Sequence, residues 1–388
     1  MTMTSSETVQ AAELGIDPEK LEAVFARAKR EVDDGTVPNA QVAVARHGKL
    51  AGFRTYGTAK QGGDEAPATN DTLFTIFSAT KGIVAAASWL LIERGQLSID
   101  ERVADIIPEF GTNGKEVITV EQLYLHAGGF PGAPFDPRQW DDRESRLQRF
   151  SSWRLNWEPG SKFEYHPVSA HWVLAEIIER KSGKDFRQFI REEITGPAGL
   201  DDIHVGLPDS ESGRVAEVDY VGEPVEPPWG WNNVNPRMLL TLNDPAAQRV
   251  GVPGGGAIST AAQIALFYQV LINEGVAPNG TRILKPETIA YATENRAPSH
   301  FTDPQLGYPV KRGLSVIIAS DDGYSHYRGM GKTVSPRAFG HNGAGGQIAW
   351  GDPETGLSLG YLTSGFNDYL TEGRRTTAIS SLAGSCLA

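Results

Sequence analysis

The sequence predicts a mixed α/β protein of the α+β type, in which one antiparallel sheet is flanked by terminal helices and a mainly helical lobe lies beside it. Strand patterns occur near both ends of the chain, helical patterns fill the middle, and helical patterns also precede the first strand and follow the last. We expect one domain over residues 1–388, with an α/β lobe at about 1–79 and 280–388 and a helical lobe at about 80–279.

The first elements are predicted from periodicity and turn residues. Apolar residues at helical spacing predict a helix over Pro18 to Val32. Two strand patterns, Gln41 to Arg46 and Leu50 to Tyr56, flank the turn sequence His47-Gly48-Lys49, which predicts a hairpin. The apolar run Thr80 to Arg94 predicts a long helix.

Later elements follow from the same signals. Further helices are expected at Thr119 to Gln122, where the sequence matches a capping box, and at Trp172 to Arg180, Ala261 to Asn273 and Leu370 to Leu382. Short strands are expected at Leu314 to Ala319, Arg337 to His341, Gly346 to Gly351 and Leu357 to Thr363. The longest irregular stretch is Val221 to Pro236, and long loops of this kind are often functional.

Composition and charge narrow the class of protein. Hydrophobic residues make up 40% and charged residues 22% of the chain, which is typical of a globular protein. The net charge of −12 and the lack of a long basic run argue against nucleic acid and anionic membranes as partners. The single cysteine, Cys386, excludes an internal disulfide. Because the N-terminus has no basic cluster followed by an apolar run, we expect no signal peptide and a soluble, cytoplasmic protein.

The segment Phe77-Ser78-Ala79-Thr80-Lys81 carries the strongest chemical signal. If a helix begins near Ser78, the hydroxyl of Ser78 and the amine of Lys81 lie one turn apart on the same face. A serine hydroxyl needs a neighbouring base to become a nucleophile, and a lysine serves when burial and other cations lower its pKa. Ser-x-x-Lys alone arises about once by chance in a chain of this length, so a surface serine and a solvated lysine are the alternative. Lys81, however, lies on an otherwise apolar helix, where a lysine without a role is unfavourable.

Two further motifs make the chain resemble the serine β-lactamase/penicillin-binding protein superfamily, and within it the class C-like esterases known as family VIII carboxylesterases. Phe163-Glu-Tyr165 resembles the family's tyrosine motif, and His341-Asn-Gly343 resembles its Lys/His-x-Gly triplet on a strand. Leu123 to Phe130 and Gly254 to Ala261 resemble two accessory segments. The resemblance runs from about Val24 to Thr363 and implies a β-lactamase/transpeptidase-like fold.

The resemblance also implies roles for single residues. Ser78 would form a covalent acyl-enzyme, with Lys81 and Tyr165 sharing the proton transfers, and the sequence leaves open which of the two is the initial base. His341 would be a further catalytic residue, and the backbone N–H groups of Ser78 and Ala344 would form the oxyanion hole.

Two departures from the family pattern affect the substrate. Pro167 stands where the tyrosine motif usually has asparagine, so Ser169 or His166 is expected to supply the missing polar contact. His341 stands where β-lactamases and transpeptidases have lysine, and a mostly neutral imidazole binds a substrate carboxylate poorly. This favours neutral esters over penicillins.

We therefore predict a serine carboxylesterase that cleaves small or medium neutral esters without a metal or cofactor. The residues expected to contact the substrate are Gly343, Ser169, Trp229, Trp231, Trp350 and Phe135, with plain core packing as the alternative for the aromatic ones. A D-amino-acid peptidase or amidase, a weak β-lactamase or an acyltransferase would use the same site. A non-catalytic protein that kept the fold is the alternative from another class. The oligomeric state is left open.

Overall fold

A seven-stranded antiparallel sheet forms the centre of the computed structural model, which describes residues 10–222 and 235–388. The strand order is β3-β2-β1-β11-β10-β9-β8. The strands are β1 (Asn39–Arg46), β2 (Lys49–Gln61), β3 (Asp64–Pro67), β8 (Ile317–Ile318), β9 (Phe339–Gly343), β10 (Gln347–Gly351) and β11 (Leu357–Leu362). Because β1 pairs with β11, the two ends of the chain meet in one sheet, as the sequence predicts.

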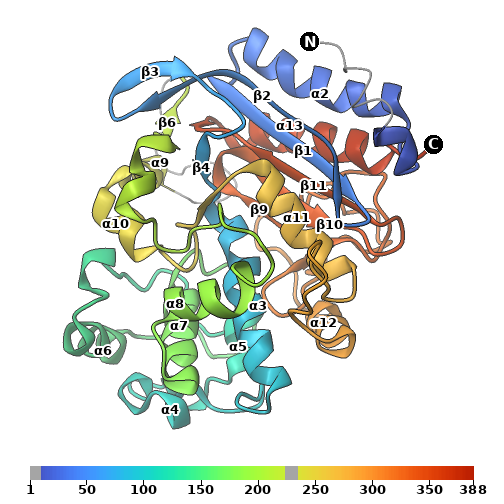
Figure 1. Ribbon diagram of the computed structural model, residues 1–388. Helices are drawn as coiled ribbons and strands as arrows, with labels where there is room; N and C mark the ends of the chain where they lie inside the picture. Colours follow the sequence, from blue (N-terminus) through green and yellow to red (C-terminus); the bar gives the residue numbers. More distant parts are fainter. Residues whose placement is uncertain (1–9, 223–234) are drawn as a thin grey trace.

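Helices cover both faces of this sheet (Figure 1). They are α2 (Pro18–Asp33), α11 (Ala261–Ile272) and α13 (Tyr369–Gly384). Alternate side chains of a strand point to opposite faces. Accordingly, Val42 and Val44 of β1 share a buried cluster with α2 and α13. Ala43 and Ala45 pack in a second cluster with α11, where their small side chains let the helix approach closely.

The middle of the chain supplies the helical part, most of which lies below the sheet in Figure 1. Its helices are α3 (Thr80–Glu93), α4 (Val103–Ile106), α5 (Val120–Tyr124), α6 (Arg143–Ser152), α7 (Ser169–Ser182), α8 (Phe186–Ile190), α9 (Pro236–Leu240), α10 (Pro245–Val250) and α12 (Pro286–Thr293). Thr119 and Gln122 form the predicted capping box at the start of α5. Every residue of α3 from Thr80 to Leu91 is buried, which explains why this helix is apolar all round.

Two small sheets complete the fold and were not predicted. One has the order β5 (Val215–Ala216), β4 (Leu73–Thr75), β7 (Ile258–Ser259), and the other pairs β6 (Asp219–Tyr220) with β12 (Gly365–Phe366). The pairing of β4 with β7 brings the glycine-rich turn before Ile258 next to the segment that leads into Ser78.

One predicted strand is shorter than expected. Only Ile317 and Ile318 of the stretch 314–319 form a strand, β8. Ser315 adopts a left-handed backbone conformation, with φ of 62°, which is incompatible with a continuous strand.

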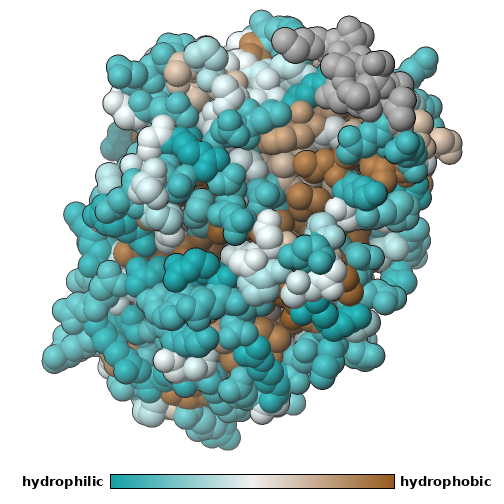
Figure 2. All heavy atoms as spheres, viewed as in Figure 1, coloured by the Kyte–Doolittle hydropathy of each residue, from teal (hydrophilic) through white to brown (hydrophobic). Residues whose placement is uncertain are grey.

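The surface agrees with the acidic, charged composition. The face shown in Figure 2 is mostly hydrophilic, with hydrophobic residues in smaller patches. Within residues 10–222 and 235–388, none of the helices combines the length and the apolar character needed to span a bilayer.

Candidate active site

Ser78 lies on a sharp turn between β4 and α3, in the short helix η1 (Phe77–Ala79). Phe77 has φ of 45°, a left-handed conformation that is uncommon for a bulky residue and costs on the order of 1–3 kcal/mol. The surrounding packing holds this conformation, since the Phe77 side chain is buried against Val218 and Phe366. The turn leaves Ser78 half-buried, while Lys81 follows in the first turn of α3.

The amine of Lys81 is fully buried and lies beside Ser78. Its Nζ is 3.2 Å from Ser78 Oγ, 2.7 Å from the carbonyl oxygen of Pro167 and 2.5 Å from the carbonyl oxygen of Gly254. Backbone carbonyls therefore provide the polar contacts that we expected from Ser169 or His166. Both side chains have other partners, because Ser169 Oγ donates to the carbonyl oxygen of Phe130, and the His166 ring bonds to the carbonyl oxygen of Glu164 through Nδ1 and accepts from the backbone N–H of Phe130 at Nε2.

Burial and a neighbouring cation set the charge of this amine. Burial first, and the Arg312 guanidinium second, hold the pKa of Lys81 well below its usual value of 10.5. Both causes act in the same direction. Lys81 thus has a readily accessible neutral form, which is the form able to accept a proton.

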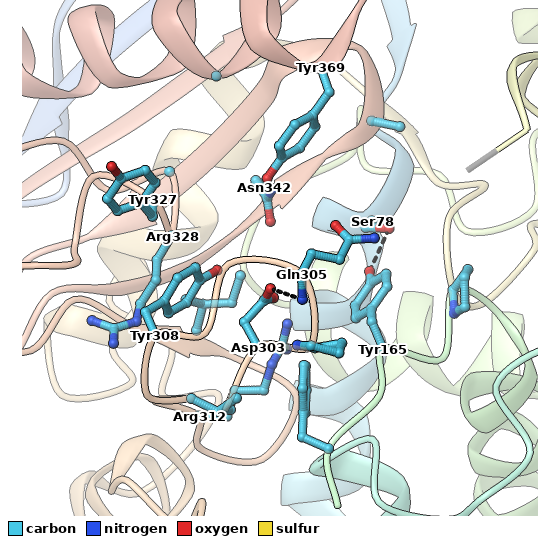
Figure 3. A pocket seen from close by; sticks show the side chains of 18 of the residues that line it. Ser78, Tyr165, Asp303, Gln305, Tyr308, Arg312, Tyr327, Arg328, Asn342 and Tyr369 are labelled. Atoms are coloured by element: carbon cyan, nitrogen blue, oxygen red, sulfur yellow. Dashed lines mark hydrogen bonds between the residues drawn. The ribbon is translucent and has the colours of Figure 1, made fainter. Parts of the chain in front are cut away.

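The phenol of Tyr165 reaches Ser78 from the other side. Its hydroxyl donates to Ser78 Oγ at 2.9 Å, and its ring centroid lies 5.0 Å from Lys81 Nζ (Figure 3). Burial raises the pKa of Tyr165 above 10.0, although the Arg312 cation and the hydrogen bond to Ser78 oppose this shift. Tyr165 is therefore a neutral phenol and a proton donor near pH 7.

Arg312 is a part of the site that the sequence did not indicate. Its side chain is buried, with 7% exposure, and its guanidinium carbon lies 5.5 Å from the ring centroid of Tyr165. Nη1 is buried without a hydrogen-bond partner in the described residues. No periodicity or motif marks this arginine, which reaches the site from the loop before β8.

His341 packs behind Tyr165, with 6.2 Å between the ring centroids. Its Nδ1 lies 2.6 Å from the carbonyl oxygen of Asn342, which fixes Nδ1 as the protonated nitrogen. Burial, followed by the cations Arg312 and Lys81, holds the pKa of His341 well below 6.5. The imidazole is therefore neutral. It does not line the cavity at Ser78, whereas the next side chain, Asn342, does.

Three more histidines are buried in the same region, as neutral rings. His126 lies 4.6 Å from Tyr165 between ring centroids, and its backbone has φ of 55°. Burial lowers the pKa of His126 and His171 well below 6.5 and that of His166 to about 3. His126 packs against Tyr165, and His166 and His171 pack against His126, so these rings surround the phenol without adding charge.

The catalytic groups open into one cavity of about 590 Å³, a size that suits a small or medium organic molecule. Ser78 and Tyr165 line it together with Gly343 and Ala344, the residues at the end of β9. A Cβ atom on Gly343 would lie 2.6 Å from the carbonyl oxygen of Ile76, so β9 packs directly against the turn that carries Ser78. The turn at Ser78, the segment that carries Tyr165 and the end of β9 are distant in sequence, but all three meet at the hydroxyl of Ser78.

Comparison with known proteins identifies the family to which this chain belongs. A family model described as "Beta-lactamase" matches residues 24–383. The chain belongs to the β-lactamase family. It is 29% identical over 314 residues to the esterase/β-lactamase LipL of Mycobacterium tuberculosis, covering 76% of this chain and 69% of that protein. The segments that carry the family resemblance in the sequence are the ones that converge on Ser78.

Two solved structures show the same fold. One is a family VIII carboxylesterase, with a TM-score of 0.79 and 26% identity over 96% of this chain and 99% of the other. A penicillin-binding protein homologue from Caulobacter crescentus has a TM-score of 0.79 and 29% identity with the same coverage. The β-lactamase family thus includes relatives named as esterases and relatives named as penicillin-binding proteins.

Several residues that we expected in the pocket of this β-lactamase family member lie elsewhere. Trp350 is fully buried and donates from Nε1 to Ser380 of α13, on the opposite face of the sheet from Ala349. Phe135 packs against Trp172, at 4.5 Å between ring centroids, in the aromatic core of the helical part. Ser169 is buried against Phe130 and also lies outside the cavity. Gly343 does line it. Trp229 and Trp231 lie outside the described residues.

Away from the cavity, Asp202, His204 and Glu211 place three potential metal ligands within 4.8 Å of one another. Arg214 already bonds to two of them, at 2.8 Å from Asp202 and 2.7 Å from Glu211. The guanidinium takes the place that a cation would occupy, so this cluster is an ion-pair network.

Proposed function

We propose that this member of the β-lactamase family is a serine hydrolase that cleaves small or medium neutral esters through an acyl-enzyme on Ser78. One observation carries the proposal. The hydroxyl of Ser78 lies within hydrogen-bond distance of a buried amine and a half-buried phenol at the wall of an open cavity. The relatives named as esterases support the same reaction class.

The lowered pKa of Lys81 favours the amine as the initial base, and its hydrogen bonds are compatible with that role. A neutral amine has two N–H groups and one lone pair. The carbonyl oxygens of Pro167 and Gly254 accept the two N–H groups, so the lone pair remains for the hydroxyl proton of Ser78. Tyr165 donates to the same oxygen, and because burial raises its pKa it keeps its proton at this stage.

The proton transfers then balance. Ser78 Oγ attacks the acyl carbon while Lys81 takes its proton, and the backbone N–H groups of Ser78 and Ala344 stabilise the oxyanion. Tyr165 protonates the departing alcohol oxygen, and the proton on Lys81 restores the phenol. A water molecule attacks the acyl-enzyme with the neutral amine again available as base, and Ser78 recovers its proton as the acid leaves. His341 acts here as a positioning residue that supports Tyr165.

A serine probe tests this assignment directly. A fluorophosphonate should label one residue, Ser78, and the Ser78→Ala variant should lose both labelling and hydrolysis of p-nitrophenyl butyrate. His341→Ala should keep partial activity, because its ring does not line the cavity. Labelling at another serine, or turnover by Ser78→Ala, would refute the proposal. A folded chain with no label and no turnover would favour a non-catalytic role.

A peptidase or amidase is the second candidate, and Arg312 is the observation that favours it. Arg312 lines the cavity as a cation, so its guanidinium is able to bind a substrate carboxylate. Comparing simple esters with D-alanyl amides and nitrocefin separates these candidates, and adding an alcohol as acceptor tests acyl transfer. We expect the esters to have the higher kcat/KM, because the neutral His341 replaces the lysine that helps β-lactamases bind a carboxylate.

A further inference from the structure

Three tyrosines form a cluster beside the cavity, and two of them, Tyr308 and Tyr327, line it on the side away from Ser78 and Tyr165 (Figure 3). We call Tyr308, Tyr324 and Tyr327 the tyrosine cluster. The ring of Tyr308 lies 5.8 Å from that of Tyr324 and 6.0 Å from that of Tyr327, with interplanar angles of 21° and 19°. The rings of Tyr324 and Tyr327 lie 6.2 Å apart and are tilted by 38° to each other, so each of them is nearly parallel only to Tyr308.

Two rings of the tyrosine cluster are exposed to solvent. Tyr324 is 40% exposed and Tyr327 is 47% exposed. Tyr308 and Tyr327 line the same cavity as the nucleophile, and Tyr369 and His326 add further rings to the lining. Exposed apolar surface of this kind, gathered at a cavity, is typical of a binding site.

Arg328 fixes the segments that carry the tyrosine cluster. Its side chain is 4% exposed and lies 5.4 Å from the centroid of the Tyr308 ring. It donates to the carbonyl oxygens of Pro309 and Ala319 and to both carboxylate oxygens of Asp322, at 2.6 to 2.7 Å. One buried guanidinium thus ties the loop before β8 to the loop after it. The rings are preorganised, which lowers the entropic penalty for binding a ligand.

The composition of the lining favours an aromatic ring over an alkyl chain as the bound group. Among branched aliphatic side chains, only Val310 and Ile317 line the cavity as the described residues define it, and each is almost fully buried. The lining has more aromatic side chains (Phe163, Tyr165, Tyr308, Tyr327 and Tyr369) than branched aliphatic ones, among polar and charged residues, and ring pairs attract each other beyond the effect of buried area. The phenol hydroxyls can stay hydrated at the rim while the ring faces contact the ligand.

We propose that the tyrosine cluster is a subsite for an aromatic ring on the substrate, so that the preferred substrates are esters with an aryl group in the acyl or the alcohol half. This inference rests on the proposed esterase function and names its substrate class. Tyr308, Arg312 and Tyr165 line the same cavity, and Asp303 and Gln305 lie between the two tyrosines in Figure 3, so one substrate can reach from the tyrosine cluster to Ser78 within this cavity.

Matched ester pairs test this subsite. For the acyl half, ethyl phenylacetate is compared with ethyl cyclohexylacetate, and for the alcohol half, phenethyl acetate is compared with cyclohexylethyl acetate. The two rings of a pair have nearly the same size and apolar character, but only one is aromatic. Each kcat/KM is divided by the rate constant of alkaline hydrolysis to remove differences in intrinsic reactivity. In one of the pairs the phenyl ester should be preferred by about 2- to 12-fold, the range that an aromatic pair contributes.

Variants assign the preference to the tyrosine cluster. Tyr327→Leu, at an exposed position, and Tyr308→Leu should each bring the ratio close to one, while Tyr327→Phe should keep it. Tyr291→Leu is the matched control, because Tyr291 is also 40% exposed but lies outside the cavity lining. A ratio near one in both pairs, or a ratio unchanged in Tyr327→Leu, would overturn the subsite while leaving the esterase function intact. If none of the four esters is cleaved and Ser78 is not labelled, the esterase function fails, and the subsite with it.

Discussion

The contact between Gly343 and the Ser78 turn gives a quantitative test of the proposed oxyanion hole. A Cβ atom at position 343 would lie 2.6 Å from the carbonyl oxygen of Ile76, whereas ordinary contacts begin at 3.4 Å. Gly343→Ala therefore requires β9 and the turn to separate by about 0.8 Å to restore an ordinary contact. The φ of −114° at Gly343 is accessible to alanine, so the perturbation is purely steric.

A separation of this size removes one oxyanion donor. A backbone N–H that lies about 2.9 Å from the oxyanion would move to about 3.7 Å, which is beyond hydrogen-bond distance. Losing one such donor reduces kcat by about 10²- to 10³-fold, or about 2.7–4 kcal/mol in the transition state. KM should change much less, because the donor acts mainly on the charge that develops during the reaction.

The assay measures kcat and KM for p-nitrophenyl butyrate together with thermal unfolding. Gly213→Ala serves as the control, since a Cβ atom there would meet nothing within 4 Å and the residue lies outside the cavity. It should keep wild-type kcat. If Gly343→Ala is folded at the assay temperature and keeps kcat within about 3-fold of wild type, the reasoning is refuted, because β9 would then not supply a donor that depends on this contact.

Three further predictions address the electrostatics and the core. Arg312→Gln removes a cation that lowers the pKa of Lys81, so the acid limb of the kcat/KM–pH profile should move to higher pH, and an unmoved limb would contradict the proposed base. Lys81→Met should abolish turnover. The pKa of Lys81 is lower in the folded state than in the unfolded state, so burying the charged amine destabilises the fold most at pH values below the folded-state pKa. This destabilisation disappears as the pH rises towards 10.5. Chemical unfolding should therefore show that the stability gained in Lys81→Met relative to wild type falls as pH increases. Trp350→Phe should reduce the free energy of unfolding by about 1–3 kcal/mol without changing the relative kcat/KM for different esters. A changed ester preference would instead indicate that Trp350 contacts the substrate.

Local sequence signals were sufficient to predict helices and strands whose formation depends mainly on their own residues. The helix predicted over Pro18 to Val32 is α2, because its apolar periodicity determines which side chains are buried. The strand predicted over Leu357 to Thr363 is β11, a short segment that follows a turn and is buried on both faces. The spacing of Ser78 and Lys81 was also sufficient to predict that their side chains meet, since the two residues lie within a single helical turn. The Tyr165 contact needed the family resemblance, because 87 residues separate it from Ser78.

Features that depend on register or on distant loops could not be predicted. We expected Trp350 in the pocket because it follows the His341 motif closely. Across the β9–β10 hairpin, however, His341 pairs with Ala349, so Trp350 is directed to the opposite face of the sheet. Arg312 and the tyrosine cluster come from irregular segments with no periodic pattern, and only the folded chain brings them to Ser78.

The polarity of the site also explains why backbone carbonyls, rather than a carboxylate, hold the catalytic amine. A carboxylate beside Lys81 would stabilise the ammonium form and raise the pKa of the amine, which would remove the free lone pair near pH 7. The carbonyl oxygens of Pro167 and Gly254 orient the amine but carry no net charge, and the nearby histidines are neutral. Burial and Arg312 then lower the pKa of Lys81 without opposition. A proline in place of the family's asparagine is compatible with this design, because position 167 contributes its carbonyl oxygen and not its side chain.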